Sequence, residues 1–272
     1  MNARLTVLAA LALSLGASLA VAGSTLDRVQ KTGVLTNVLV NDYPPFGFID
    51  SSNHLAGFDV DVANAVAKRL GVKLKLETPG WETIVGGKWQ GRWDLCICSM
   101  TPSTERAKVL DFAAAYYSSP AVLIVNKDDK AIRSIKDISG KKIGVGTGSS
   151  YEAYLNKTLQ IPGAKPITYS FTNVQPVPSD ETVAFQNLAL GSGVRLDGVV
   201  SDLATARARI KETGKFKIVG TLYREPNWVA VDKGDDAWKA KVAATIAALR
   251  ADGTLAKISK KWLGEDITKE NF

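Results

Sequence analysis

The sequence has a single histidine, His54, and only two cysteines, Cys96 and Cys98, among 272 residues. One histidine excludes a zinc centre built on several histidines, and two cysteines alone give a metal too few ligands. In a strand, Cys96 and Cys98 would point to the same face, where a bridge between residues i and i+2 strains disulfide geometry, so we expect buried thiols. His54 lies in the turn-like stretch DSSNHLAG and is expected on a solvated loop. We predict neither a metal nor a cofactor.

Long apolar runs are also lacking beyond the start of the chain. Residues 1–22 combine Arg4, an apolar run over residues 5–20 and the small-residue ending AVA, which is typical of a secretory signal peptide. No later run approaches the roughly 20 apolar residues that a membrane-spanning helix needs. Both cysteines lie far from the expected cleavage site, so no lipid-bearing cysteine follows it. We therefore predict a soluble periplasmic protein that is released by cleavage and is not a lipoprotein.

The surplus of positive charge is small. The chain has 34 Lys and Arg against 27 Asp and Glu, and removal of Arg4 leaves 33 − 27 = +6. The lysines are dispersed along the chain, which favours a mildly basic soluble surface and predicts no nucleic-acid partner.

Hydrophobic periodicity alternates between that of strands and that of helices. The stretches GVLTNVLV, KLKLE and WDLCICS read as strands, WETIVGGKWQG as a short helix, and residues 58–70 as an amphipathic helix that stops at Gly71. Strand, loop and helix follow one another at 141–159 and again at 195–212. The stretch TNVQPVPSDE, within residues 171–181, reads as a surface excursion. The pattern predicts an α/β fold with mainly parallel sheets.

Three predicted strands end in polar stretches, CSMTPSTER, GTGSSYE and VVSDLA. Ligands of open α/β sheets bind at such carboxyl ends. The first two stretches offer hydroxyls, helix-start amides and Arg106, which suit an anion, and the third offers Asp202, which suits a cation. Taken singly, Arg106 also fits a surface salt bridge and Asp202 a helix N-cap. GVGTGSS lacks the spacing of a dinucleotide fingerprint.

Together, the stretches DYPPFGFID, LAGFDVDVANAVAKRLG, WDLCICSMTPSTERAKVLDFAAAYY, KKIGVGTGSSYEAYL and LDGVVSDLATA resemble the periplasmic amino-acid-binding proteins of ABC importers. These are the polar amino acid type of solute-binding protein family 3, and the resemblance covers essentially the whole mature chain. It implies a two-lobed Venus-flytrap fold of type II, in which each lobe is a mainly parallel sheet flanked by helices. The implied division is 1–22 for the signal peptide, 23–124 with 221–272 for lobe 1, and 125–220 for lobe 2, with hinges at Ile124 and Gly220.

The resemblance also implies a role for each site residue. Arg106 would bind the carboxylate of an amino acid, a hydroxyl residue at a helix start would approach it from the second lobe, and Asp202 would pair with the α-ammonium. Aromatic residues would cover the side chain from both walls. The implied ligand contacts are Tyr43, Trp81, Ser99, Thr101, Arg106, Ser149, Ser150 and Asp202.

Two departures from the family pattern concern the ligand. Ser99 replaces a glycine that is often found there, and Val40 stands where some binders of cationic amino acids have an acid, which lowers the expectation for Lys or Arg. The identity of the amino acid stays open, and a derivative such as an opine is the runner-up ligand.

The function predicted from the resemblance is the extracytoplasmic solute-binding component of an ABC importer, a monomer that delivers an L-amino acid or derivative to a membrane permease and is not an enzyme. Two alternatives remain. One is an enzyme of the cyclohexadienyl dehydratase type, for which Glu152 and Glu181 are available as general acids. The other is a ligand-sensing subunit of a membrane receptor.

Overall fold

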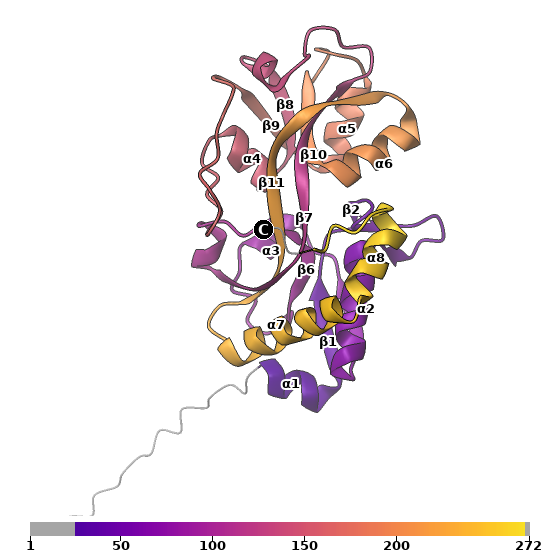
Figure 1. Ribbon diagram of the computed structural model, residues 1–272, viewed down its shortest axis with the longest axis vertical. Helices are drawn as coiled ribbons and strands as arrows, with labels where there is room; N and C mark the ends of the chain where they lie inside the picture. Colours follow the sequence, from indigo (N-terminus) through magenta and orange to yellow (C-terminus); the bar gives the residue numbers. More distant parts are fainter. Residues whose placement is uncertain (1–24, 270–272) are drawn as a thin grey trace, which may run out of the picture.

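The computed structural model describes residues 25–269 and has two lobes stacked along its long axis (Figure 1). Two long strands, β7 (Leu110–Asn126) and β11 (Phe216–Asp232), run side by side through both lobes and pair antiparallel. The predicted signal peptide, residues 1–22, lies outside the described residues. Between residues 25 and 269, no helix is both long and apolar enough to cross a membrane.

The lower lobe in Figure 1 contains both ends of the described chain. Strand β1 pairs in parallel with β5, and β6 pairs antiparallel with β11. A small antiparallel sheet of β2, β3 and β4 lies beside the junction of the lobes. The elements are α1 (Thr25–Thr32), β1 (Val34–Val38), β2 (Asp42–Tyr43), β3 (Gly47–Ile49), β4 (Leu55–Ala56), α2 (Phe58–Leu70), β5 (Lys73–Glu77), α3 (Trp81–Val85), β6 (Cys96–Met100), the 3₁₀ turn η1 (Arg106–Lys108), α7 (Asp236–Ala251) and α8 (Thr254–Leu263).

Helix α2 shows how sequence patterning becomes packing. Phe58, Val62 and Val66 recur at helical spacing and are all buried in the lower core, as predicted. Gly71 then ends the helix at a φ of 73°, a left-handed conformation that favours glycine.

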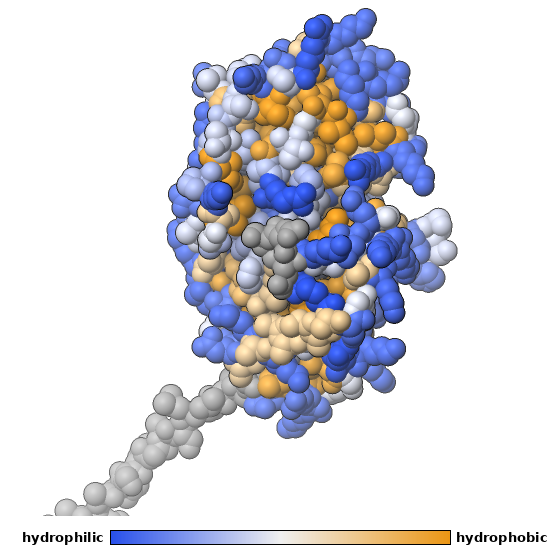
Figure 2. Space-filling model, viewed as in Figure 1, coloured by the Kyte–Doolittle hydropathy of each residue, from blue (hydrophilic) through white to orange (hydrophobic). Residues whose placement is uncertain are grey.

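The upper lobe is built on the other half of a six-stranded sheet with the order β6-β11-β7-β10-β8-β9. Strand β8 is parallel to both β9 and β10, whereas β7 is antiparallel to β10. On the face drawn in Figure 2, hydrophilic residues rim both lobes and hydrophobic residues gather mainly over the upper one. The elements are η2 (Ile135–Ile138), β8 (Lys142–Gly146), α4 (Ser150–Leu155), β9 (Gln175–Ser179), α5 (Glu181–Ala189), β10 (Gly198–Asp202) and α6 (Leu203–Thr213).

The stretch 172–181 lies at the surface as expected, but it is not a loop, because most of it is strand β9 and the start of α5. Pro176 and Pro178 made this stretch read as a loop in the sequence, because proline is uncommon inside strands. Strand β9 lies at the edge of the sheet, where a residue without an amide proton is tolerated because one side of the strand has no partner.

The expectation of two buried thiols is also wrong. Cys96 and Cys98 are buried as predicted, but they form a disulfide. Their Cα atoms lie 5.2 Å apart on β6, within the separation that a disulfide ordinarily spans. His54 is exposed in its loop, as predicted.

The hydrophobic cores show where the chain passes from one lobe to the other. The lower-lobe core includes Tyr117 on β7 and Val229 on β11, while the upper-lobe core begins at Ala121. The expected hinge residues lie inside the upper lobe: Ile124 belongs to an upper-lobe core cluster, and Gly220 lies against Ile135. The segments between the two cores are residues 118–120 of β7 and 224–228 of β11.

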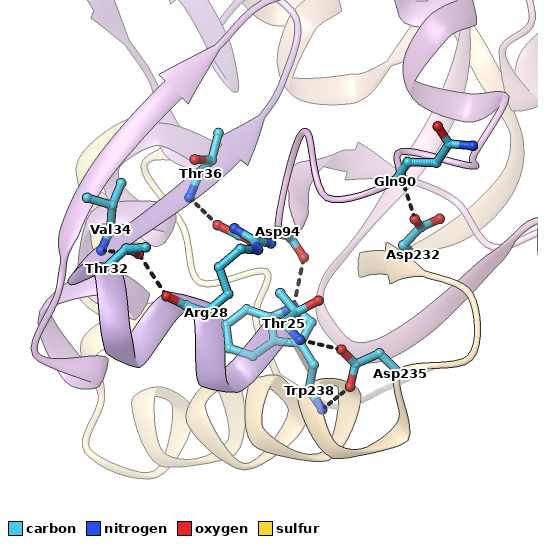
Figure 3. Close-up of polar contacts among 10 residues, drawn as sticks. All are labelled: Thr25, Arg28, Thr32, Val34, Thr36, Gln90, Asp94, Asp232, Asp235 and Trp238. Atoms are coloured by element: carbon cyan, nitrogen blue, oxygen red, sulfur yellow. Dashed lines mark hydrogen bonds and ion pairs between the residues drawn. The ribbon is translucent and has the colours of Figure 1, made fainter. Parts of the chain in front are cut away.

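The buried residue Asp94 connects several elements at the base of the lower lobe (Figure 3). Asp94 is 1% exposed, accepts the backbone amide of Thr36 at 2.6 Å and pairs with Arg28 on α1. The indole nitrogen of Trp238 on α7 donates to the Asp94 carbonyl at 2.7 Å. These bonds connect α1, β1 and α7 at the end of the lower lobe that lies far from its junction with the upper lobe.

Candidate ligand-binding site

A cavity of about 590 Å³ lies between the lobes and is lined by residues of both. Two of the predicted site residues, Thr101 and Asp202, are buried behind its wall. The other six line it: Tyr43, Trp81, Ser99, Arg106, Ser149 and Ser150.

Arg106 comes from the lower lobe, at the start of η1. Its guanidinium donates to the carbonyl of Thr101 at 2.8 Å and to that of Gly148, in the upper lobe, at 2.8 Å, and it lies 5.2 Å from the centre of the Trp81 ring. It is 8% exposed, so the alternative of a surface salt bridge does not hold. Burial lowers the pKa of Arg106 to about 10, against the opposing effect of Glu225, so the cation persists at neutral pH.

Glu225, on β11 between the lobes, is a site residue that the sequence analysis missed. Its Oε2 accepts the hydroxyl of Thr101 at 2.6 Å and that of Ser150 at 2.8 Å, and the residue is 2% exposed. One carboxylate thus bonds hydroxyls of both lobes, beside Arg106. No sequence pattern marks Glu225, because it lies within a long strand rather than at a strand end.

Aromatic residues close the cavity from both sides. The hydroxyls of Tyr43 in the lower lobe and Tyr151 in the upper lobe lie 2.9 Å apart, and Trp81 donates its indole N–H to the Gly148 carbonyl at 3.3 Å. Burial raises the pKa of Tyr43 and of Tyr151 well above the ordinary tyrosine value, so both phenols are neutral. They present flat rings and neutral hydroxyls to a ligand.

Ser99 lies where the sequence departs from the glycine of the family. Its φ is 56°, in the left-handed region that favours glycine, which explains the family preference. Its hydroxyl donates to Asp59 at 2.7 Å, and its amide donates to the Tyr116 hydroxyl at 2.7 Å. Burial raises the pKa of Asp59 to about 7. The Ser99 side chain is therefore engaged behind the wall of the cavity.

Ser149 caps helix α4 from the upper lobe. Its hydroxyl accepts the amide of Glu152 at 3.2 Å, and the Glu152 carboxylate accepts the amide of Gly148 at 2.7 Å. This reciprocal capping holds the loop before α4 in place. It also engages Glu152, one of the two acids considered for catalysis.

Asp202 ends β10 and is the N-cap of α6, as its position predicted. One oxygen, Oδ1, accepts the amide of Ala204 at 2.6 Å, but the buried Oδ2 has no hydrogen-bond partner among the described residues. Burial raises the pKa of Asp202 to about 7, although bonds from Ser119 and Ala204 favour its charged form. An unpaired buried carboxylate oxygen is costly unless a cation or donor reaches it.

Besides Glu225 and the exposed Glu82, three acids line the cavity, and the sequence analysis did not group them. Asp42 comes from the lower lobe, and Asp180 and Glu181 come from the upper lobe at the carboxyl end of β9. Burial and the neighbouring charge of Asp180 raise the pKa of Asp42. Burial raises the pKa of Glu181 to about 8, against a bond from Ser201. A correct reading of β9 as a strand would have revealed Asp180 and Glu181 as strand-end residues.

The chemistry of the cavity suits a dipolar organic guest. Arg106 offers N–H donors to the cavity, and carboxylates from both lobes offer acceptors. Across residues 25–269, no group of three or more His, Cys, Asp or Glu side chains is arranged to hold a metal ion.

Comparison with known proteins gives a consistent result. The model of the family described as bacterial extracellular solute-binding proteins, family 3, matches residues 35–265. The L-cystine-binding protein TcyJ of Escherichia coli is 33% identical over 247 residues, which cover 90% of this chain and 88% of that protein. The structure of an ancestral arginine-binding protein bound to glutamine matches with a TM-score of 0.73 and 36% identity, over 86% of this chain and 99% of that one. The structure of the ancestral amino acid-binding protein AncCDT-1, a precursor of cyclohexadienyl dehydratase, matches with a TM-score of 0.75 and 30% identity, over 88% and 100%.

Proposed function

Because the chain belongs to family 3 of the bacterial extracellular solute-binding proteins, we propose that it captures an L-amino acid between its lobes and delivers it to an ABC permease. Membership confirms the resemblance found in the sequence and the type II two-lobed fold. The names of the relatives, for cystine and for arginine, support an amino acid as the ligand. We further propose a monomer that reaches the periplasm by cleavage of its signal peptide and carries no lipid anchor.

Two observations support this proposal: Arg106 lines the cavity between the lobes, and Asp202 has a buried carboxylate oxygen without a partner among the described residues. A guanidinium has five N–H donors, and the two carbonyl bonds of Arg106 leave three for a ligand carboxylate. The Ser150 hydroxyl also lines the cavity from the upper lobe, where it donates to Glu225. The Oδ2 of Asp202, which is buried without a partner among the described residues, is the acceptor for the α-ammonium. A zwitterion satisfies both ends at once, whereas an isolated acid or amine satisfies one.

The same geometry explains why the ligand would close the lobes. Arg106 and Trp81 belong to the lower lobe, and each donates to the Gly148 carbonyl of the upper lobe. A guest held between these walls makes its full set of contacts only when the walls are close, so binding shifts the equilibrium toward closure. We place the hinges at 118–120 and 224–228, in the segments between the two cores.

Thermal denaturation with a panel of L-amino acids tests the proposal. A ligand at a hundredfold excess over its Kd stabilises the native state by about 2.7 kcal/mol, which a melting curve resolves easily. We expect one or a few amino acids to raise the melting temperature of the wild type, with little effect on Arg106→Ala. If no amino acid in the panel, cystine included, shifts the melting temperature, the proposed function fails.

One observation favours a second candidate, an enzyme of the dehydratase type. Glu181 lines the cavity with its pKa raised to about 8, so it keeps a proton at neutral pH as a general acid must. The likeness to a precursor of cyclohexadienyl dehydratase agrees with this candidate. We favour binding without turnover because the matching family and the relatives named for cystine and arginine are binding proteins. Incubation with prephenate or arogenate separates the two: product formation that is lost in Glu181→Gln would establish the enzyme.

A further inference from the structure

The acidic and basic residues that line the cavity are unequal in number. Arg106 is the one basic residue that lines it within the described chain, against five acids: Asp42, Glu82, Asp180, Glu181 and Glu225. An amino acid with a neutral side chain brings only one positive group to this surface. We propose that the ligand is an amino acid whose side chain ends in a cation, an ammonium or a guanidinium, and that Asp42, Asp180 and Glu181 receive it. This inference rests on the proposed function and specifies the ligand class of the same cavity.

The three acids meet only because the lobes meet. Asp42 lies on β2 of the lower lobe, next to Tyr43, while Asp180 and Glu181 join β9 to α5 in the upper lobe. Helix α5 packs directly against β2 across the junction. A cation between them would favour the ionised forms of these acids and would contact both walls, so it would favour closure as well as binding.

Glu181 lacks the bonds that would satisfy a purely structural acid. Its Oε1 pairs with the Ser201 hydroxyl, but its Oε2 is buried without a hydrogen-bond partner among the described residues. Arg209 is the cation that offsets charge here, yet its guanidinium donates to Glu212 at 3.2 Å and to Thr182 at 2.9 Å. Arg209 therefore moderates the negative potential, and neither of these bonds goes to Glu181. The unpaired Oε2 of Glu181 could accept a hydrogen bond from a cationic group of the ligand.

This acid group is separate from the acceptor proposed for the α-ammonium. Asp202 lies behind the wall at the start of α6, whereas Asp42, Asp180 and Glu181 line the cavity itself. Two separate acceptors suit a guest with two positive groups. The expectation drawn from Val40 is reversed on this view, since the acid missing at position 40 is supplied two residues later and from the other lobe.

Titration calorimetry with matched ligands tests the inference. Arginine and citrulline have nearly the same shape but differ in charge, and so do lysine and norleucine. A charge-assisted hydrogen bond is equivalent to roughly 10- to 150-fold in affinity, so we expect arginine or lysine to bind the wild type at least about 10-fold more tightly than its neutral match. Asp42→Asn and Glu181→Gln keep the shape of the side chain and should reduce that ratio by about 10-fold each, with the affinity for the neutral match nearly unchanged.

The control variant is Asp236→Asn, because the Asp236 carboxylate is 92% exposed and does not line the cavity. It should leave the ratio unchanged, and melting curves of all variants without ligand verify that each is folded. Citrulline or norleucine binding as tightly as its cationic match would overturn the inference while leaving the proposed function intact. Tight binding of cystine with none of arginine or lysine would do the same. Failure of every amino acid to bind would overturn the proposed function instead.

Discussion

The neutral substitution Glu225→Gln should tighten binding of the amino acid. Glu225 accepts the Ser150 hydroxyl at 2.8 Å and the Thr101 hydroxyl at 2.6 Å. These are the hydroxyls expected to approach the ligand carboxylate, beside Arg106. A bound ligand carboxylate would therefore lie next to the Glu225 carboxylate and would compete with it for these hydroxyl protons.

The magnitude follows from the distances. The Ser150 hydroxyl has one proton, so a ligand carboxylate oxygen that accepts it at about 2.8 Å competes with the Oε2 of Glu225 and lies within about 5.6 Å of that oxygen. At that separation two unit charges repel by about 3 kcal/mol at an effective dielectric constant near 20. Arg106 offsets part of this repulsion because it attracts both carboxylates. We expect about 1.4 to 2.8 kcal/mol, or a 10- to 100-fold lower Kd, for Glu225→Gln.

Titration calorimetry with the best ligand of the amino-acid panel measures the effect. The gain should vanish for the decarboxylated analogue of the same ligand, because the repulsion needs the second carboxylate. Asp236→Asn removes an exposed charge that does not line the cavity and should leave the Kd unchanged. A Glu225→Gln variant that binds the amino acid equally or more weakly would refute the reasoning and would assign Glu225 to the support of Thr101 and Ser150.

Three further predictions concern other parts of the molecule. Arg106→Ala should raise the Kd for the amino acid by about 100-fold or more, since charge-assisted bonds contribute about 1.5–3 kcal/mol each, and an unchanged calorimetric Kd would contradict its role. The pKa values of Asp202 and Glu181 are raised to about 7 and about 8, and a bound cation favours their ionised forms, so affinity for a cationic amino acid should fall as the pH drops from 8 toward 5; calorimetry that shows a constant Kd over this range would argue against both acids as acceptors. Asp94→Ala should lower the free energy of unfolding in urea by about 2–4 kcal/mol, because it leaves the Thr36 amide and Arg28 without their buried acceptor. Asp236→Ala, which removes a 92% exposed carboxylate of the same lobe, should leave it unchanged.

Much of the fold could be predicted from the sequence because its signals are local. Helix α2 follows from the spacing of Phe58, Val62 and Val66 and from the glycine that ends it. Likewise, Arg106, Ser149 and Ser150 could be found because each follows a strand, and the ends of neighbouring strands converge. Strand β9 was missed because its two prolines are ordinarily signs of a loop, and their tolerance depends on the edge position, which only the assembled sheet defines.

The electrostatics of the site could not be predicted because they depend on contacts between distant segments. Glu225 is 124 residues from Thr101 and 75 from Ser150, and it reaches both only because β11 passes between the lobes. The proposed hinge positions also depend on contacts between distant segments. Strands β7 and β11 run through both lobes without a break, so only the packing around them shows where one core ends and the other begins. Asp42 and Glu181 are each unremarkable beside their own neighbours, and they define a charged surface only when α5 packs against β2. The identity of the guest is therefore determined at the junction of the lobes, where single substitutions such as Asp42→Asn can change the preferred charge of the ligand without altering either core.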